Sequence, residues 1–477
     1  MLETLIENFS LIATLYVLNY GLAAVCAARE IMISRTSQAT IAWLLSLALL
    51  PFPTTIVYLV VGWKLFDTMA DEKLRSGRSW RVSRAEQLRI VDLESSHEWP
   101  VLTKVAELPF LYGNAANLLI DGEETFGSIL DGIARAERYI YIEFYIIRDD
   151  DLGRRFADAL IERAHAGVEV YLLYDDAGSF WLPRRYIRRL RAAGIRVYSF
   201  NHRHSFLRIY GPTRINYRNH RKILVVDGEE AWVGGHNVGD EYLGKDPKFG
   251  RWRDTHVHLA GPSALACAAV FREDWYWSVG EELSHPPPDD IRTPGEEPIL
   301  VMPTGPADAL EDCSIAFTEV IARARERLWI VSPYFVPGIE TTTALYAAAL
   351  RGVDVRILLP ERPDHMLVWL ASHAHADQMV RHGIKVYRYE GGFLHQKVIL
   401  CDDQLAGMGT VNFDARSFAI NFEVTLWFTG PVMIERIKAM LDVDLESSRL
   451  TTAIALRKRN FLFRLACQGA RLFSPIL

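Results

Sequence analysis

The chain has 477 residues, which is more than one hydrophobic core usually holds, so we expect it to divide into two or three structural units. Half of the residues are hydrophobic and 23% are charged, a composition that excludes a largely disordered chain. The formal net charge of −6 argues against a protein that coats nucleic acid, because neutralising phosphates requires a concentrated basic surface. The five cysteines are odd in number, dispersed and without CxxC spacing, and are predicted to be reduced structural thiols.

The first 67 residues contain two long uncharged stretches. Residues 9–28 carry no charge over a length that can cross a hydrocarbon core as a helix, and residues 39–63 form a second such stretch, which Pro51 and Pro53 are expected to kink. Residues 1–8 lack the basic residues of a signal peptide. We therefore predict two transmembrane helices, with a buried hairpin of a soluble core as the alternative.

The charges that flank these stretches predict their orientation. The connection between them offers Arg29 and Arg35, whereas six basic residues follow the second stretch, so the positive-inside rule places both chain termini and the rest of the chain after residue 63 in the cytoplasm. Residues 68–94 look like a basic juxtamembrane linker. At the other end, residues 451–477 alternate basic and apolar residues. This pattern indicates an amphipathic helix on a membrane surface, or a terminal helix packed on the domain.

The rest of the chain is an internal duplication. In each copy, helical sequence ends and a short apolar strand follows, which is typical of alternating α and β elements in a sheet covered on both faces. The matching segments are 133–147 with 321–336, 164–176 with 349–361, and 192–200 with 381–389. We therefore predict two α/β/α sandwich domains related by a pseudo-twofold axis, at 95–282 and 298–450, with the Pro-rich and acidic stretch 283–297 as the linker.

Each half carries one His-x-Lys-x4-Asp motif, followed at equal spacing by an Asn. Two copies in register within a duplicated frame are not a coincidence. The residues are His220, Lys222, Asp227 and Asn237 in the first half, and His395, Lys397, Asp402 and Asn412 in the second.

Alternate side chains of a strand share a face, so each His should lie beside its Lys. If the two halves meet on the pseudo-twofold axis, they create one site with two His, two Lys and two Asn. Such a site suits attack at a phosphodiester: the lysines and amides hold the phosphate oxygens, one His is the nucleophile, and the other is the general acid and base. This chemistry needs neither a metal nor a cofactor, and we expect none.

Four acids accompany the motifs. Asp227 and Asp402 are part of the motif and are therefore predicted to be catalytic. An acid just beyond an apolar strand also fits a turn cap or an ion pair. Asp254 and Glu423 come later in each half, and each is predicted to hydrogen-bond the second ring nitrogen of the histidine of its own half, with a plain salt bridge as the alternative.

Three other features are more simply explained as structural. His373 and His375 would diverge on a helix, so we expect a helical surface rather than a metal cluster. Glu143 and Tyr334 lie at strand ends, where core or rim packing is favoured over a role in the pocket.

At these motifs the chain resembles the phospholipase D superfamily over about residues 114–421. The two N-terminal stretches, NYRNHRK, WRDTH, GFLHQK and NFDARSF resemble bacterial cardiolipin synthases in particular, although GGHN departs from the Gly-Ser pair of many superfamily members. The resemblance implies a multi-pass protein of the bacterial inner membrane that joins two phosphatidylglycerol molecules into cardiolipin, releasing glycerol, through a phosphohistidine intermediate.

The same resemblance implies roles for single residues. His220 would be the nucleophile and His395 the general acid, although a nearly symmetric site leaves their order open. Lys222, Lys397, Asn237 and Asn412 would bind phosphate, and Asp254 and Glu423 would orient the histidines. The residues alone also allow a phospholipase D-type hydrolase or a synthase that uses phosphatidylethanolamine, and they leave the oligomeric state open, a homodimer included.

Overall fold

The computed structural model describes residues 2–33, 37–59, 94–96, 98–200, 217–288, 290–308, 310–457 and 459–474. The chain forms two compact units, one holding the N-terminal helices and one holding both halves of the duplication. The linker predicted at 68–94 lies outside the described residues except for Glu94.

The N-terminal unit contains α1 (Leu2–Ile33), α2 (Ser37–Leu49) and α3 (Pro51–Val57). The break at Leu50 confirms the expected kink, because Pro51 has no N–H to continue the α2 ladder but fits the first turn of α3. Tyr58 donates a hydrogen bond to Glu30 at 3.0 Å, and both side chains are buried. Among the described residues, no helix combines the length and the apolar character needed to cross a membrane. The last residues of the second predicted span, 60–63, lie outside the described residues.

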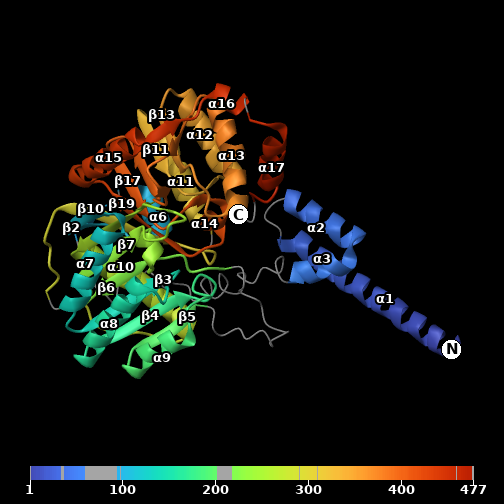
Figure 1. The fold of residues 1–477 in the computed structure, drawn as a ribbon, viewed down its shortest axis with the longest axis horizontal. Helices are drawn as coiled ribbons and strands as arrows, with labels where there is room; N and C mark the ends of the chain where they lie inside the picture. The colour runs from blue at the N-terminus through green and yellow to red at the C-terminus, as the bar shows by residue number, and fades with distance from the viewer. Residues whose placement is uncertain are drawn as a thin grey trace. The chain divides into compact units, whose positions relative to one another are not determined.

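The second unit is built on one 16-stranded mixed sheet that runs through both halves. In spatial order the first half contributes β2-β9-β7-β6-β3-β4-β5 and the second contributes β10-β19-β17-β16-β11-β13-β14, the same arrangement twice. The antiparallel pair β2 and β10 joins the halves (Figure 1). The predicted duplication is therefore present as symmetry of the sheet, but the two sandwiches share that sheet.

The strands of the first half are β1 (Ser95–Ser96), β2 (Phe110–Ile120), β3 (Tyr139–Phe144), β4 (Glu169–Asp175), β5 (Arg196–Phe200), β6 (Ile223–Val226), β7 (Glu230–Gly234), β8 (Trp252–Arg253) and β9 (Thr255–Ala260). Those of the second half are β10 (Glu297–Thr304), β11 (Arg327–Val331), β12 (Phe335–Val336), β13 (Asp354–Pro360), β14 (Lys385–Tyr389), β15 (Phe393–Leu394), β16 (Val398–Cys401), β17 (Leu405–Gly409), β18 (Phe413–Asp414), β19 (Glu423–Phe428) and β20 (Ser448–Leu450).

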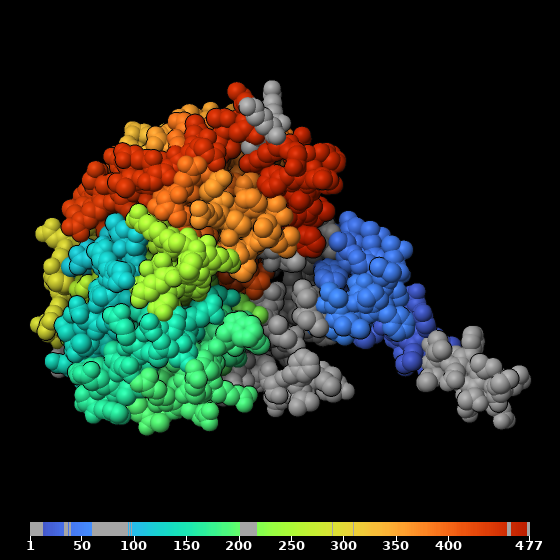
Figure 2. All heavy atoms as spheres, viewed as in Figure 1, coloured from blue at the N-terminus to red at the C-terminus, as the bar shows by residue number. Residues whose placement is uncertain are grey.

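Helices cover both faces of the sheet, as the apolar strands predict. On β3, Ile140 and Ile142 belong to a core with α7, α8 and α9, whereas Tyr139 and Tyr141 belong to the core that contains α10. The two halves pack into one continuous body (Figure 2). The helices are α6 (Pro100–Ala106), α7 (Asp121–Arg135), α8 (Asp151–His165), α9 (Arg184–Ala192), α10 (Pro262–Val279), α11 (Asp312–Arg323), α12 (Ile339–Leu350), α13 (Met366–Arg381), α14 (Ala415–Ala419) and α15 (Pro431–Glu446), with the short 3-10 helix η4 (Asp240–Leu243).

The C-terminal segment forms α16 (Ala453–Arg457) and α17 (Phe461–Arg471), and α17 packs against α13. The ring of Phe463 lies against His373, while Phe461 on the same helix is exposed. The predicted helical position of His373 and His375 is confirmed, but the expectation that they lie on the surface is wrong, because α17 and the residues after it cover them. His375 contacts Ser474 at 3.0 Å, and both histidines are buried.

Candidate active site

Both motifs converge on one cavity of about 580 Å³, whose wall includes residues of both halves. The backbone brings them there. The N–H of His220 donates to the carbonyl of Phe422 at 2.9 Å, and the N–H of His395 donates to the carbonyl of Arg253 at 2.8 Å. Each motif is thus held by a segment of the other half. The cavity wall includes His220, His395, Asn237 and Asn412.

The acids that follow the motifs are exchanged between the halves. Nδ1 of His220 lies 2.9 and 3.0 Å from the carboxylate oxygens of Glu423, and Nδ1 of His395 lies 2.6 Å from Asp254. The expectation that each acid contacts the histidine of its own half is wrong. The reason is the cross-half backbone pairing just described, because Phe422 precedes Glu423 and Arg253 precedes Asp254. A carboxylate that accepts the Nδ1–H leaves the Nε2 lone pair available.

Burial sets the charge of the two histidines. It lowers the pKa of His220 and of His395 to about 4, so both rings are neutral at pH 7. Burial would raise the pKa of Asp254, but Lys397 and His395 hold it well below its usual range. Burial likewise opposes ionisation of Glu423, and His220 and Lys222 outweigh it and lower its pKa. The site at rest therefore pairs two neutral imidazoles with two ionised acids.

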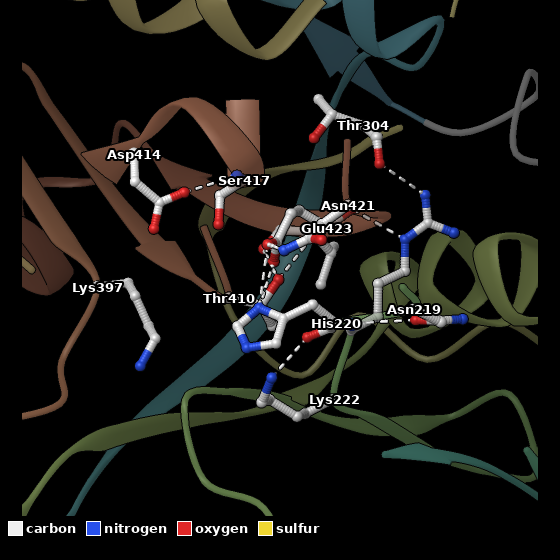
Figure 3. A network of polar contacts seen from close by, with 12 residues as sticks. Asn219, His220, Lys222, Thr304, Lys397, Thr410, Asp414, Ser417, Asn421 and Glu423 are labelled. Carbon is white, nitrogen blue, oxygen red and sulfur yellow. Dashed lines mark hydrogen bonds and ion pairs between the residues drawn. The ribbon is translucent and has the colours of Figure 1, made fainter. Parts of the chain in front are cut away.

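The two lysines lie deeper than the histidines and are almost fully buried. Nζ of Lys222 donates to the carbonyl oxygen of His220 at 2.6 Å, and Nζ of Lys397 donates to that of His395. Figure 3 shows the His220 ring between Glu423 and Lys222. Burial lowers the pKa of Lys222 to about 7 and that of Lys397 to about 8. Both ammonium groups therefore begin to lose their charge close to neutral pH.

The two asparagines differ in how far their amides are already used. Asn237 accepts a hydrogen bond from the N–H of Ile146 at 3.1 Å and donates one to the hydroxyl of Tyr242 at 3.0 Å. The Oδ1 atom of Asn412 is buried and has no hydrogen-bond partner in the described part of the chain. The structure thus places both predicted amides on the cavity, and Asn412 keeps an acceptor for a donor that enters it.

The described cavity wall does not include Asp227 or Asp402, which favours the structural alternative over grouping them with the catalytic residues. The carboxylate of Asp227 accepts hydrogen bonds at 2.8 Å from the backbone N–H groups of 137, 138 and 139. That of Asp402 accepts them from 325, 326 and 327 at 2.8 to 3.0 Å. Each acid stands five residues beyond its Lys, roughly 16 Å along an extended chain. Both have positive φ, 56° and 53°, in a tight turn. These contacts fit the alternative in which the two acids cap a turn.

Several wall residues are not apparent from the motif spacing. The ring of Tyr145 lies 5.0 Å from that of His220, and the ring of Trp252 lies 5.0 Å from that of His395. Tyr334 lines the cavity and donates to Asp364, whereas Glu143 is buried and is not among the described wall residues. The wall also includes Arg218, Asp414 and Arg416. The sequence signal that marks them is their place in NYRNHRK and NFDARSF, close to His220 and Asn412.

A buried polar network lies behind His220. Arg221 donates to Asp274 at 2.6 Å, to the carbonyl of Glu423 at 2.9 Å and to that of Thr304 at 3.2 Å. Burial, and the nearby Asp274, raise the pKa of Glu143 well above its usual range. The guanidinium of Arg221 thus joins the two halves directly beneath the acid that contacts His220.

Known proteins share this arrangement. Residues 129–247 and 317–445 match the family model described as the PLD-like domain of cardiolipin synthase, and residues 21–63 match the model described as the phospholipase D-nuclease N-terminal segment. The chain is 41% identical over 474 residues to cardiolipin synthase A of Pseudomonas fluorescens, covering 97% of this chain and 98% of that protein.

Two further comparisons agree. Cardiolipin synthase A of Pseudomonas aeruginosa is 42% identical over 469 residues, covering 96% of this chain and 94% of that protein. Phosphatidylserine synthase of Haemophilus influenzae, a crystal structure, has a TM-score of 0.59 at 14% identity, with 79% of this chain and 99% of that chain covered. At that identity, the second likeness shows the shared fold alone.

Proposed function

The chain belongs to the cardiolipin synthase family of the phospholipase D superfamily, and we propose that it transfers a phosphatidyl group between two phosphatidylglycerol molecules, giving cardiolipin and glycerol. The observation that carries this proposal is the pair of His–carboxylate contacts, one from each half, on a single cavity. One site with two imidazoles suits a displacement in two steps.

In the first step, Nε2 of His220 attacks the phosphorus of the donor lipid, and a phosphorus–nitrogen bond forms as the bond to the glycerol oxygen breaks. Protonated His395 gives its proton to that oxygen. Entry of the anionic phosphodiester favours the charged form of the imidazole. Lys222 and Lys397 stabilise the charge that develops on the non-bridging oxygens. In the second step, His395 takes the proton of the acceptor alcohol, whose oxygen displaces His220.

We further propose that the N-terminal unit is embedded in the bacterial inner membrane as a multi-pass anchor, with the catalytic unit on the cytoplasmic side. The uncharged stretches support this, as does the outward exposure of Val17 and Leu18 on α1. On α17, the exposed Phe461 and Leu462 stand near Arg464, which supports contact of this helix with an anionic lipid surface.

The test is mass spectrometry of the lipids made by the full-length protein from phosphatidylglycerol, beside His220→Ala and His395→Ala. Cardiolipin should form with the wild-type protein and fall by roughly 10⁴-fold or more with either variant, because each histidine acts in both steps. Phosphatidic acid without cardiolipin would indicate a hydrolase. Cardiolipin that appears only after phosphatidylethanolamine is added would indicate the other donor.

The order of the two histidines needs a separate measurement. Phosphatidylglycerol labelled at phosphorus should leave an alkali-stable, acid-labile label on His220 of the wild-type protein after rapid quenching, because the phosphorus–nitrogen bond forms before the acceptor alcohol reacts. The label should be absent from His220→Ala. A label on His395 instead would reverse the assignment.

A further inference from the structure

Two arginines from opposite halves lie on the wall of the reaction cavity. Arg218 stands two residues before His220, and Arg416 stands in the short helix α14 of the second half. Both are half-buried and both line the cavity. Burial, and then the charge of Arg218, lowers the pKa of Arg416, in agreement with the position of both cations on one wall.

The backbone holds both arginines in place through one segment. The N–H of Phe422 donates to the carbonyl of Arg218 at 2.9 Å, and the N–H groups of Ile420 and Asn421 donate to that of Arg416 at 2.8 and 3.0 Å. Residues 420–422 therefore connect the two positions directly. The backbones of the two arginines are thus held relative to one another, so only their side chains need to order around an anion.

The acids nearest to the pair are already engaged. The carboxylate of Asp175 accepts hydrogen bonds from the N–H groups of Ala177, Gly178 and Asn219 at 2.9 to 3.0 Å. Asp414 accepts from the N–H of Ser417 at 2.7 Å, and burial raises its pKa to about 6. The charges of these carboxylates offset part of the repulsion between the guanidinium groups.

The arginine pair has no counterpart across the pseudo-twofold axis. The position two residues before the motif His is Arg218 in the first half and Phe393 in the second. The position four residues after the motif Asn is Arg416 in the second half and Glu241 in the first. The His, Lys and Asn of the phosphoryl chemistry occur twice, whereas this pair occurs once. It is therefore suited to an anion other than the phosphate that reacts.

We propose that Arg218 and Arg416 form a second phosphate subsite, which binds the phosphodiester of the acceptor phosphatidylglycerol and, in the reverse reaction, the second phosphate of cardiolipin. This inference rests on the proposed function. An acceptor phosphatidylglycerol carries its own phosphate, and one glycerol group separates that phosphate from the attacking hydroxyl. Free glycerol as the acceptor carries no phosphate. Arginine suits such a group, because its planar fork bonds two phosphate oxygens at once.

The experiment compares two acceptors with the same donor. The full-length protein in mixed micelles is given phosphatidylglycerol with and without isotope-labelled glycerol, and mass spectrometry quantifies cardiolipin and labelled phosphatidylglycerol. Arg218→Gln and Arg416→Gln should each lower cardiolipin formation about tenfold or more, as expected for loss of a charged hydrogen bond. Exchange of labelled glycerol should stay within about twofold, since that acceptor carries no phosphate.

Arg148→Gln is the matched control. Arg148 lines the same cavity and carries the same charge, but its nearest acid is Glu241 at 3.4 Å, in the first half. Its ratio of cardiolipin to exchanged phosphatidylglycerol should equal that of the wild-type protein.

Two results would overturn the inference. An equal fall of both products in the Arg218 and Arg416 variants would assign the arginines to the donor or to the fold, and no fall in either would place the acceptor phosphate elsewhere. Failure of the proposed function is distinct, because the wild-type protein itself would then exchange glycerol without making cardiolipin.

Discussion

The surroundings of His220 and His395 differ although the motifs around them are the same. Behind His220, the charged Arg221 binds Asp274 and the backbone of the second half. The equivalent position beside His395 is the neutral Gln396, which donates to Asp444 at 2.9 Å. There the cation is supplied by Arg253, which binds the same Asp444 at 2.7 Å.

The difference also extends to the acids. Glu423 accepts a hydrogen bond from Asn421 at 3.1 Å, whereas Asp254 has the buried His236 and His256 nearby. The atoms that carry out the transfer are duplicated, and the groups that support them are not. Two imidazoles of the same origin can therefore perform different tasks, and because each depends on an acid of the other half, neither half is sufficient.

The largest expected effect concerns the exchanged acids. Glu423→Gln and Asp254→Asn should each lower kcat by roughly 10²- to 10⁴-fold, because the ring facing them loses its orientation and its preferred tautomer. In a double-mutant cycle, Glu423→Gln should add little to His220→Ala, since its partner is already absent. Steady-state kinetics of all single and paired variants measure this. Additivity of Glu423→Gln with His220→Ala would contradict the exchanged pairing.

The buried cations provide the next comparison. Arg221→Met should destabilise the catalytic unit by about 3–5 kcal/mol, because it leaves the Asp274 carboxylate buried without its charged partner. Gln396→Met, at the equivalent position, removes a neutral donor only and should cost about 1–3 kcal/mol. Thermal unfolding of the purified variants compares the two. Equal losses of stability would mean that the charged Arg221 contributes no more to the free energy of unfolding than the neutral Gln396.

A smaller effect is expected at the turn acids. Asp227→Asn should cost about 1–2 kcal/mol, because a neutral amide replaces a carboxylate that accepts three backbone hydrogen bonds, while Asn tolerates the positive φ. The kcat of the folded variant should stay within about twofold. Asp403→Asn, at an exposed neighbour of Asp402, is the control and should change stability by less than about 0.5 kcal/mol. A large loss of kcat in Asp227→Asn would restore its catalytic assignment.

The smallest effect is the pH dependence. The histidines are neutral above their pKa of about 4, and the lysines are charged only below their pKa values of about 7 and about 8. The first step needs His220 neutral and His395 protonated, so we expect kcat/KM to fall at acid pH as His220 takes up a proton and to fall at alkaline pH as His395 loses its proton. The two lysines should add a further fall between pH 7 and 8. Lys222→Arg should remove the fall near pH 7 and leave that near pH 8, because a guanidinium stays charged. A profile that stays flat up to pH 10 would exclude both lysines as the alkaline groups.

The local sequence pattern was sufficient to predict the candidate site residues that occur in both halves. The spacing of His220, Lys222 and Asn237, matched in the second half, predicted one composite site. The structure brings the histidines and asparagines of both halves to one cavity and buries the lysines behind the histidines. The apolar strands predicted a sheet covered on both faces, because residues buried on both sides leave no polar alternation. Pro51 predicted the break between α2 and α3 for an equally local reason, namely the missing N–H.

Tertiary structure alone decided which groups meet across the halves. Nothing in the spacing shows that Glu423 contacts His220 or that Arg218 lies near Arg416, since these pairs are about 200 residues apart and depend on how β2 joins β10. The burial of His373 under α17 is of the same kind. A sequence determines what each segment can do locally, through side-chain periodicity and backbone chemistry. The partner of a buried charge is determined only when the sheet closes and water is excluded from that charge.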